Sequence, residues 1–270
     1  MPWIPRGLRN GVVTTRYPKR FDVEAGAVHT AVSVVARGPD ERTHDAQRAC
    51  PTGAITIDAQ RVALDRGRCI LCGRCTRLDP ATFRDELNSE VAVVRRSHLV
   101  VPMTDETDDE LDRLQGELHR RVRALRRSVF IRHVDAGSDG SDEWEVAALT
   151  NPIYDIQRLG LYFTASPKHA DLLLVTGAGS AGMLGPLRHT LSVMPRPLVV
   201  VAAGVDAISG GVVGESYATR GGVLDVVPAD VVVPGAPPSP FSLLHGILLG
   251  VGVLGNARSA STIAHAGARP

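Results

Sequence analysis

The stretch Cys50-Pro51, followed by Cys69-Ile-Leu-Cys72-Gly-Arg-Cys75, contains all four cysteines of this 270-residue chain. Three thiols in one Cys-x2-Cys-x2-Cys run, with a fourth in a separate Cys-Pro pair, form a pattern that is typical of a [4Fe–4S] cluster site. Iron in such a cluster is soft enough to prefer thiolate sulfur to harder ligands. The sequence therefore predicts one [4Fe–4S] cluster, with Cys50, Cys69, Cys72 and Cys75 as its ligands.

A zinc site is the main alternative for these cysteines, because four thiolates also bind Zn²⁺. Structural zinc sites usually show two Cys-x2-Cys pairs, whereas this chain has one three-cysteine run and a lone Cys-Pro pair. Disulfides are less favoured still, because the run crowds three thiols into one loop and no secretory signal peptide is recognisable. The iron–sulfur cluster is the preferred interpretation.

The flanking sequence retains the frame of a second, incomplete motif. A two-cluster ferredoxin has the run twice, each ending in Cys-x3-Cys-Pro. Counted from Cys50 and Cys75, the missing cysteines would fall on Asp40, Thr43, Ala46 and Asp79. Residues 36–98 thus resemble a bacterial-type ferredoxin that keeps one cluster and has lost the other. His44, beside the lost run, is interpreted as a solvated loop histidine.

Composition and charge exclude several classes of function. The formal net charge is +1, and no long basic run is interleaved with aromatic residues, so no nucleic-acid partner is expected. The longest apolar run, Leu243–Leu254, is far shorter than the ~20 residues of a membrane span and predicts a buried helix. Residues 1–35 mix arginines with Trp3, Ile4 and Leu8; they are either a basic amphipathic edge that contacts a membrane or partner, or a surface-packed arm.

The periodicity changes along the chain and predicts two folded parts. Ala54–Asp58 and Arg61–Asp65 alternate as two strands around a turn, inside an α+β ferredoxin-like domain over 1–98. A linker at 99–127 contains a predicted helix at 104–127, with leucines and a valine spaced three and four residues apart.

From residue 128 to 255, apolar strands alternate with helices, which predicts an α/β doubly wound, flavodoxin-like parallel-sheet domain. Strands are expected at 129–134, 170–176, 197–203 and 230–234. Ligands of such folds bind at the carboxyl ends of the strands. The tail at 256–270 is small and polar and is predicted to be disordered.

Short sequence motifs near the ends of the predicted strands resemble those of one family. These motifs are Arg132-His-Val-Asp-Ala-Gly137, Ala148-Leu-Thr-Asn-Pro152, Ala165-Ser-Pro-Lys-His-Ala-Asp171 and Val233-Pro-Gly-Ala-Pro-Pro-Ser-Pro240. They resemble the small subunit of group 4 membrane-bound [NiFe] hydrogenases and formate hydrogenlyase, a family that includes the B-type subunit of respiratory complex I. Residues 1–98, with Gly7-Leu-Arg-Asn-Gly11 and Val13-Thr-Thr-Arg-Tyr-Pro18, resemble the ferredoxin-like iron–sulfur subunit of formate hydrogenlyase and complex I. The chain thus resembles a fusion of two neighbouring subunits.

The resemblance implies a second cluster site whose four cysteines are all replaced. The family's ligand positions fall on Asp139, Asp142, Asp206 (or Val205) and Ala236. A [4Fe–4S] cluster needs thiolates, so no cluster is predicted in the second domain. The three aspartates could bind a hard cation such as Mg²⁺ or Ca²⁺. The favoured alternative is that they fill an emptied pocket or form hydrogen bonds and salt bridges there.

Three functions follow for comparison. The first is an iron–sulfur electron-transfer subunit of a membrane-associated hydrogenase, formate hydrogenlyase or complex I-related oxidoreductase. The second is a redox-inactive docking subunit of such a complex. The third is a nucleotide-dependent enzyme that uses Gly177-Ala-Gly179-Ser-Ala-Gly182, although no acidic residue follows at the end of the next strand. No catalytic residue and no complete active site are predicted.

The preferred interpretation combines the first two functions. By the same resemblance, the expected partners are a hydrogenase large subunit, or its quinone-binding counterpart in complex I, and integral membrane subunits. The expected location is the cytoplasmic face of the cell membrane, as a peripheral component.

Overall fold

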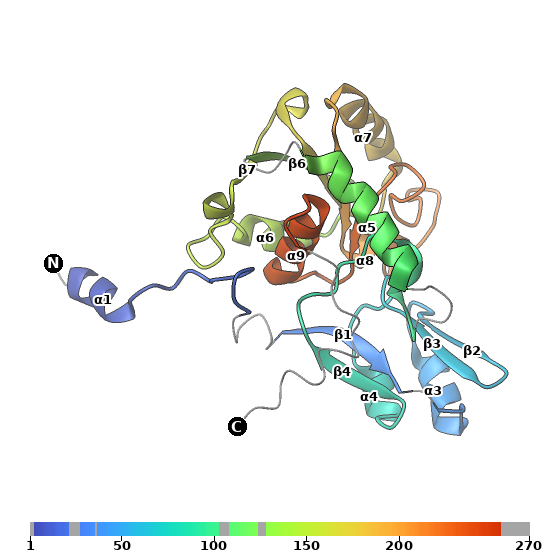
Figure 1. The fold of residues 1–270 in the computed structure, drawn as a ribbon. Coiled ribbons are helices and arrows are strands. Elements are labelled where there is room, and N and C mark those ends of the chain that lie inside the picture. Colours follow the sequence, from blue (N-terminus) through green and yellow to red (C-terminus); the bar gives the residue numbers. More distant parts are fainter. Residues whose placement is uncertain (1–2, 22–27, 36, 103–107, 124–127, 255–270) are drawn as a thin grey trace.

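The computed structural model describes residues 3–21, 28–35, 37–102, 108–123 and 128–254. Two small antiparallel sheets form in the first hundred residues, and one five-stranded sheet forms in the rest (Figure 1). The predicted tail at 256–270 and both ends of the predicted helix at 104–127 lie outside the described residues.

The five-stranded sheet is parallel throughout and has the order β10-β9-β8-β6-β7. Its strands are β6 Val129–Asp135, β7 Leu161–Phe163, β8 Leu172–Thr176, β9 Val199–Ala203 and β10 Val231–Val233. Numbered within this domain, the order is 2-1-3-4-5, which is the flavodoxin-like arrangement. The prediction of a doubly wound α/β domain is confirmed. The sequence missed β7, because three residues at a sheet edge carry too little apolar pattern to be recognised.

Helices cover both faces of this sheet. They are α6 Ser141–Ala148, α7 Ala181–Val193, the short α8 Val205–Ser209 and α9 Pro240–Gly250. One core cluster joins β8, β9 and β10 to α9, and a second joins the opposite face to α7 and α8. All residues of β8, β9 and β10 are buried, which explains why their sequences are continuous apolar runs.

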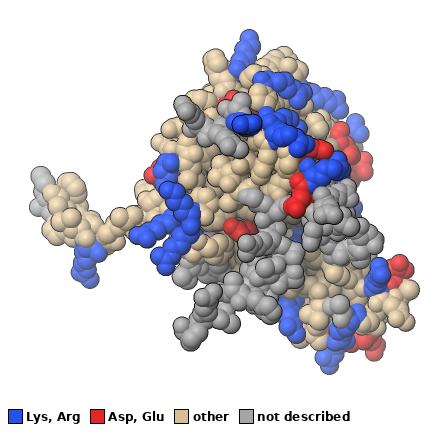
Figure 2. Space-filling view, in the orientation of Figure 1, with Lys and Arg blue, Asp and Glu red and all other residues tan. Residues whose placement is uncertain are grey.

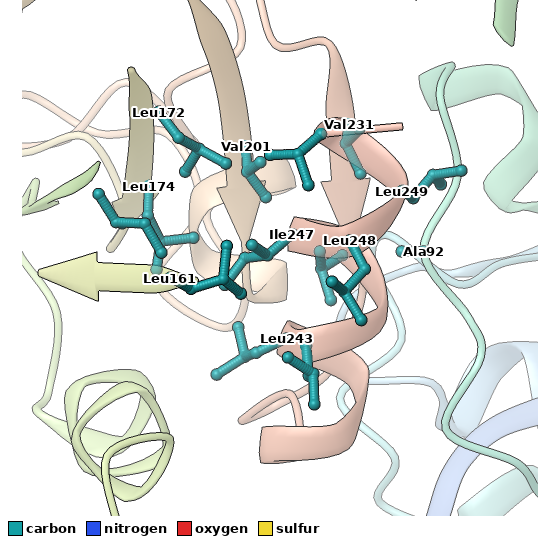
Figure 3. Close-up of a cluster of buried hydrophobic side chains, with 14 of the residues drawn as sticks. Ala92, Leu161, Leu172, Leu174, Val201, Val231, Leu243, Ile247, Leu248 and Leu249 are labelled. Carbon is teal, nitrogen blue, oxygen red and sulfur yellow. The ribbon is translucent and has the colours of Figure 1, made fainter. Parts of the chain in front are cut away.

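Helix α9 is buried along its whole length, as predicted for the longest apolar run. Figure 3 shows Leu243, Ile247 and Leu248 of this helix packed toward side chains of the sheet, among them Leu174 and Val201. Nowhere in the described part of the chain is a helix both long enough and apolar enough to cross a bilayer.

The first part of the chain forms a smaller α+β unit with antiparallel sheets. Its elements are α1 Trp3–Asn10, β1 His29–Val34, α3 Glu41–Ala49, β2 Ile55–Asp58, β3 Arg61–Asp65, α4 Arg74–Leu78, β4 Phe83–Leu87, the 3-10 turn η1 Arg96–Leu99 and β5 Val100–Val101. Strand β1 pairs with β4, and β3 pairs with both β2 and β5. The predicted hairpin at 54–65 is therefore present. The core of this unit includes Val32, Leu64, Cys75 and Phe83.

Packing between the two parts of the chain is extensive. Tyr17 and Ala92 belong to the core cluster of the parallel sheet. The N–H of Ala92 donates to Nδ1 of His245 in α9 at 3.2 Å. Helix α5, Asp108–Val122, also lies against α9, and a ring nitrogen of His119 is 3.2 Å from the carbonyl oxygen of Leu254. Leu118 and Val122, two residues of the apolar stripe predicted for the linker helix, belong to the core cluster of the parallel sheet.

The N-terminal arm divides into an exposed and a packed section. Helix α1 projects from the body of the protein, and none of its residues is buried (Figure 1). Figure 2 shows basic side chains on the projecting helix and near its base. Tyr17, by contrast, is buried and meets Phe241 edge-to-face with a ring distance of 6.0 Å. The packed-arm interpretation therefore fits the residues around Tyr17, and α1 remains uncovered.

Candidate functional site

The four cysteines line one pocket in the first part of the chain. Cys50 follows α3, Cys69 and Cys72 lie in the loop before α4, and Cys75 lies in α4. The remaining lining is mainly apolar, and its side chains come from β1, β2, β3 and the cysteine loop. Left-handed backbone at Leu71 and Gly73 turns the loop so that its three cysteines lie on the same pocket.

The thiols influence one another electrostatically. Burial raises the pKa of Cys75 to about 12, and the neighbouring Cys69, Cys72 and Cys50 add to that rise. Burial likewise raises the pKa of Cys69 to about 11, with Cys50 and Cys72 again contributing. A group of thiols that resists losing protons on its own needs a positively charged centre to become four thiolates. An iron–sulfur core or a metal ion is the kind of group that supplies this charge.

The donor set and its surroundings fit a cluster. The backbone N–H of Ala54 donates to Sγ of Cys50 at 3.3 Å, and such N–H groups tune the potential of thiolate-bound iron. Cys75 is buried, Cys50 and Cys69 are half-buried, and Cys72 is exposed. Among the residues that the structure describes, no three His, Cys, Asp or Glu side chains stand close enough together to hold a metal ion directly.

The positions where the ferredoxin resemblance would place a second set of cysteines form a hydrogen-bonded cluster. The N–H of Thr43 donates to Oδ1 of Asp40 at 3.0 Å and caps helix α3. The hydroxyl of Thr43 donates to Oδ2 of Asp79 at 2.8 Å, and the N–H of Thr82 donates to Oδ1 of Asp79 at 3.1 Å. Thr43, Ala46 and Asp79 are all buried. Asp40, Thr43 and Asp79 thus hold one another by polar contacts, and the small Ala46 lies in the core.

A second cavity, of about 430 Å³, opens at the carboxyl ends of the parallel strands. Asp139 and Asp142 follow β6, Asp206 follows β9, and Ala236 follows β10. All four positions that the family resemblance assigns to a second cluster line this cavity, as does Val205. The other lining residues are Ile70, Gly137, Ser138, Ser141, Ala178, Val212, Val213, Thr219 and Gly235. The topology therefore brings these positions together beside the switch point of the strand order.

Asp142 has the most unusual environment of the three acids. It is only 3% exposed, and its Oδ2 makes no hydrogen bond. Burial raises the pKa of Asp142 to about 8, and the negative charges of Asp206, Glu143, Asp139 and Asp135 contribute to that rise.

The other two acids are better solvated. Burial, followed by repulsion from Asp139 and Glu143, raises the pKa of Asp206. Asp139 is exposed, and hydrogen bonds from Ser141 lower its pKa. The pKa is therefore raised for Asp142 and Asp206 and lowered for Asp139.

Glu143 belongs to a separate polar chain behind the cavity. One carboxylate oxygen accepts from Oγ1 of Thr176 at 2.5 Å, and the other accepts from the hydroxyl of Ser138. Oγ1 of Thr176 also lies 2.9 Å from a ring nitrogen of His133. Burial lowers the pKa of this histidine. These contacts leave Glu143 satisfied, unlike its neighbour Asp142.

The glycine-rich turn at 177–182 connects β8 to α7, as expected, but three of its backbone N–H groups donate to other parts of the chain. The N–H of Ala178 donates to Gly137, that of Ser180 to Ala136 and that of Ala181 to Ala218. A Cβ on Gly179 would lie 2.2 Å from the carbonyl oxygen of Gly222, so a neighbouring loop covers the turn. Phosphate binding needs free N–H groups at this place, which disfavours the nucleotide hypothesis.

Sequence reasoning missed one residue that connects the two sites. Ile70, between Cys69 and Cys72, lines both the thiol pocket and the acid-lined cavity. Within the motif it is an ordinary spacer, and only the packing of the first part on the second gives it this place. The two predicted sites are therefore neighbours.

Comparisons with known proteins show which family the second part of the chain resembles. Residues 140–249 match the family described as NADH ubiquinone oxidoreductase, 20 Kd subunit. Formate hydrogenlyase subunit 7 of Escherichia coli is 34% identical over 57% of this chain, which spans 58% of that relative's length. A probable membrane-bound hydrogenase subunit of Pyrococcus furiosus, mbhJ, is 35% identical over 53% of this chain and 85% of the relative.

Among solved structures, the membrane-bound sulfane sulfur reductase, an archaeal respiratory membrane complex, contains a chain that is 29% identical. The match covers 50% of this chain and 76% of that one, with a TM-score of 0.43. The Pyrococcus relative, matched over most of its length, decides the assignment. The chain belongs to the family of the small (20 Kd) subunit of NADH–ubiquinone oxidoreductase and the related [NiFe]-hydrogenase small subunits.

Proposed function

We propose that this chain is an iron–sulfur electron-transfer subunit of a membrane-associated, hydrogenase-related oxidoreductase complex. Cys50, Cys69, Cys72 and Cys75 would hold one [4Fe–4S] cluster in a ferredoxin-like domain. Such a cluster, when bound, supplies one-electron redox chemistry. The observation that carries the proposal is that all four thiols of the chain line one largely apolar pocket.

The residues around the thiols support this assignment. The apolar lining limits the access of water, and the N–H of Ala54 stabilises negative charge on the sulfur of Cys50. Cys72 is the exposed member of the set, so the shortest route for an electron to a partner protein begins on its side of the pocket.

The second part of the chain is proposed to hold no cluster. Two of the four family positions, Asp139 and Ala236, are exposed, and none of the four has a thiol. Carboxylates and a methyl group do not replace the soft ligands that such a cluster needs. The electron-transfer route within this chain would therefore end at the cluster of the first domain.

The partners of the chain are proposed from its relatives and its surface. The two curated relatives carry the names of a formate hydrogenlyase subunit and a membrane-bound hydrogenase subunit. Val212 and Val213, which line the acid-lined cavity, are largely exposed, as are Tyr217 farther along the same loop and Trp144 of α6. Exposed apolar side chains of this size are typical of protein interfaces. We propose that a hydrogenase large subunit, or its quinone-binding counterpart in complex I, binds there. Integral membrane subunits would lie nearby, with this chain peripheral to the membrane on its cytoplasmic face.

The test is the iron and acid-labile sulfide content of anaerobically purified protein, with EPR spectra after reduction. We expect about four irons per chain and one S = 1/2 signal. Cys72→Ser should abolish the signal, whereas Thr76→Ser, a change in the adjacent helix that keeps the hydroxyl, should leave it intact.

Two other results would change the assignment. About eight irons per chain would show that the second domain does hold a cluster. Zinc without iron would make the first domain a structural module, and the chain would then be the redox-inactive docking subunit of the complex.

A further inference from the structure

Helix α1 presents an apolar face that nothing in the described part of the chain covers. Successive residues of a helix are about 100° apart, so Trp3, Ile4 and Leu8 lie on one side of α1. Arg6 and Arg9 lie on the opposite side. Trp3 is 68% exposed and Leu8 is 81% exposed. Because the helix projects from the body of the protein (Figure 1), packing within the chain does not account for this amphipathic pattern.

The length of α1 also indicates an outside partner. The helix has eight residues, and isolated helices shorter than about 12 residues are marginal in water. In folded proteins, most of the stability of a helix comes from packing of its apolar face. Helices α5 and α9 place such residues in the core cluster of the parallel sheet, whereas none of α1 is buried. A surface outside the chain that covers Trp3 and Leu8 would supply the missing stabilisation.

The N-terminal arm that carries α1, residues 3–21, has charge of a single sign. It contains five basic residues, Arg6, Arg9, Arg16, Lys19 and Arg20, and no Asp or Glu. The whole chain, by contrast, has 30 Lys and Arg against 29 Asp and Glu. Figure 2 shows basic side chains on the projecting helix and again near its base. The cations are thus spread along the arm, and an extended negative surface matches them better than a single acidic side chain.

The arm is attached to the body of the protein just behind α1. The hydroxyl of Thr14 donates to the carbonyl oxygen of Pro152 at 2.8 Å, and the N–H of Thr15 donates to that of Ile153 at the same distance. Val12, between the helix and this attachment, is 86% exposed. The exposed section of the arm therefore starts from a fixed point on the second part of the chain.

We propose that α1 binds the surface of an anionic phospholipid bilayer, with its apolar face in the headgroup region and its arginines against lipid phosphates. Helices with Lys and Arg on one face and Trp and Leu on the other lie in the plane of the membrane interface in this way. Trp is itself enriched at such interfaces, because its ring is apolar and its N–H needs a polar partner. This contact goes beyond the proposed docking on membrane subunits, and it does not require the iron–sulfur cluster.

A bilayer fits the arm better than a groove in a partner protein. The apolar face of α1 is small, so much of the binding energy has to come from charge. Each Lys or Arg near an anionic membrane strengthens binding roughly fivefold. A continuous layer of anionic headgroups can meet the basic residues of the helix and those near its base at the same time.

Co-sedimentation of the purified chain with lipid vesicles tests this proposal. We expect binding to vesicles of phosphatidylcholine that contain phosphatidylglycerol, little binding to phosphatidylcholine alone, and weaker binding as NaCl is raised. Replacing both Arg6 and Arg9 with Gln should weaken binding about 20-fold. Trp3→Ala should weaken it roughly tenfold. The matched control replaces Arg42 and Arg61, two exposed residues outside the arm, with Gln; it changes the net charge equally and should have little effect.

Tryptophan fluorescence shows whether α1 itself enters the lipid. The chain has two tryptophans, so Trp144→Phe leaves Trp3 as the only one. Vesicles that contain phosphatidylglycerol should shift the emission of Trp3 to shorter wavelength, and brominated acyl chains should quench it. Circular dichroism and iron content of each variant report separately on folding and on the cluster.

Absence of binding to the anionic vesicles, equal binding to both kinds of vesicle, or binding that survives the substitutions in α1 would each overturn the proposal. An arm that instead binds a protein of the complex would give the first of these results. Vesicle binding with unchanged Trp3 emission would also overturn it, because another surface would then make the contact. None of these results depends on whether the cysteines hold iron, so failure of this proposal and failure of the proposed electron-transfer function are distinguishable.

Discussion

Replacing Asp142 with Asn should stabilise the protein, and more so at high pH. The folded state raises the pKa of this carboxyl from an ordinary value of 3.8 to about 8. The unfolded chain therefore releases the proton first, and the stability that Asp142 gives at low pH is lost as the pH rises toward 8. Above pH 8 the folded protein carries a buried, unpaired charge.

The magnitude follows from the two pKa values. For each pH unit between them, the free energy of unfolding falls by about 1.4 kcal/mol. Between pH 6 and the folded pKa of about 8, the wild-type protein should lose about 2–3 kcal/mol that the Asn variant keeps. That is a large share of the roughly 5–15 kcal/mol that stabilises a typical domain.

Urea unfolding at pH 6 and pH 9, in the presence of a chelator, measures the effect. The difference in unfolding free energy between Asp142→Asn and wild type should widen by about 2–3 kcal/mol at the higher pH. Asp58→Asn serves as the control and should show no such widening. A difference that stays constant over this range would refute the reasoning, because Asp142 would then ionise in the folded protein as easily as in the unfolded chain.

Two further substitutions test the packing around helix α9. His245→Leu should cost about 1–3 kcal/mol at pH 7, because it leaves the buried N–H of Ala92 without an acceptor. Burial also lowers the pKa of His245 to about 4, so wild type should lose stability as the pH falls from 6.5 toward 4, whereas the variant should not; parallel acid profiles would contradict this. Gly246→Ala should cost about 1–3 kcal/mol in thermal unfolding, because its Cβ would lie 2.3 Å from Cγ2 of Val233. Gly182→Ala in α7, where a Cβ meets open space, should instead be neutral or stabilising by about 0.5 kcal/mol, and equal losses in both variants would rule out overpacking as the cause.

The parts of the fold that the sequence predicted are those with strong local patterns. Strands β8, β9 and β10 are continuous apolar runs, and α9 is the longest apolar stretch of the chain, so burial on all sides is visible in the residues themselves. Strand β7 escaped notice because its three residues, at the edge of the sheet, depend on pairing with β6 for their conformation.

The sites divide in the same way. Cysteine spacing alone identified the residues of the thiol pocket, because the chemistry of the motif requires that spacing. The convergence of Asp142 and Asp206 came from the family resemblance, since no local pattern connects residues so far apart in the chain. Tertiary packing alone brings Gly204 against Asp142 and Gly211 against Asp206. It also places Ile70 between the two pockets.

The pairing of Val93 with Val232 has a consequence for how the chain can be divided. Each of these residues donates its N–H to the carbonyl of the other, at 3.0 and 2.8 Å, along the outer edge of β10. A sheet edge of unpaired valines is a template for pairing with other chains, and proteins protect such edges. The first part of the chain provides that protection in cis. Expressed alone, the second part would expose β10, three valines long, as an unpaired edge strand. We expect it to aggregate unless the segment around Val93 is retained.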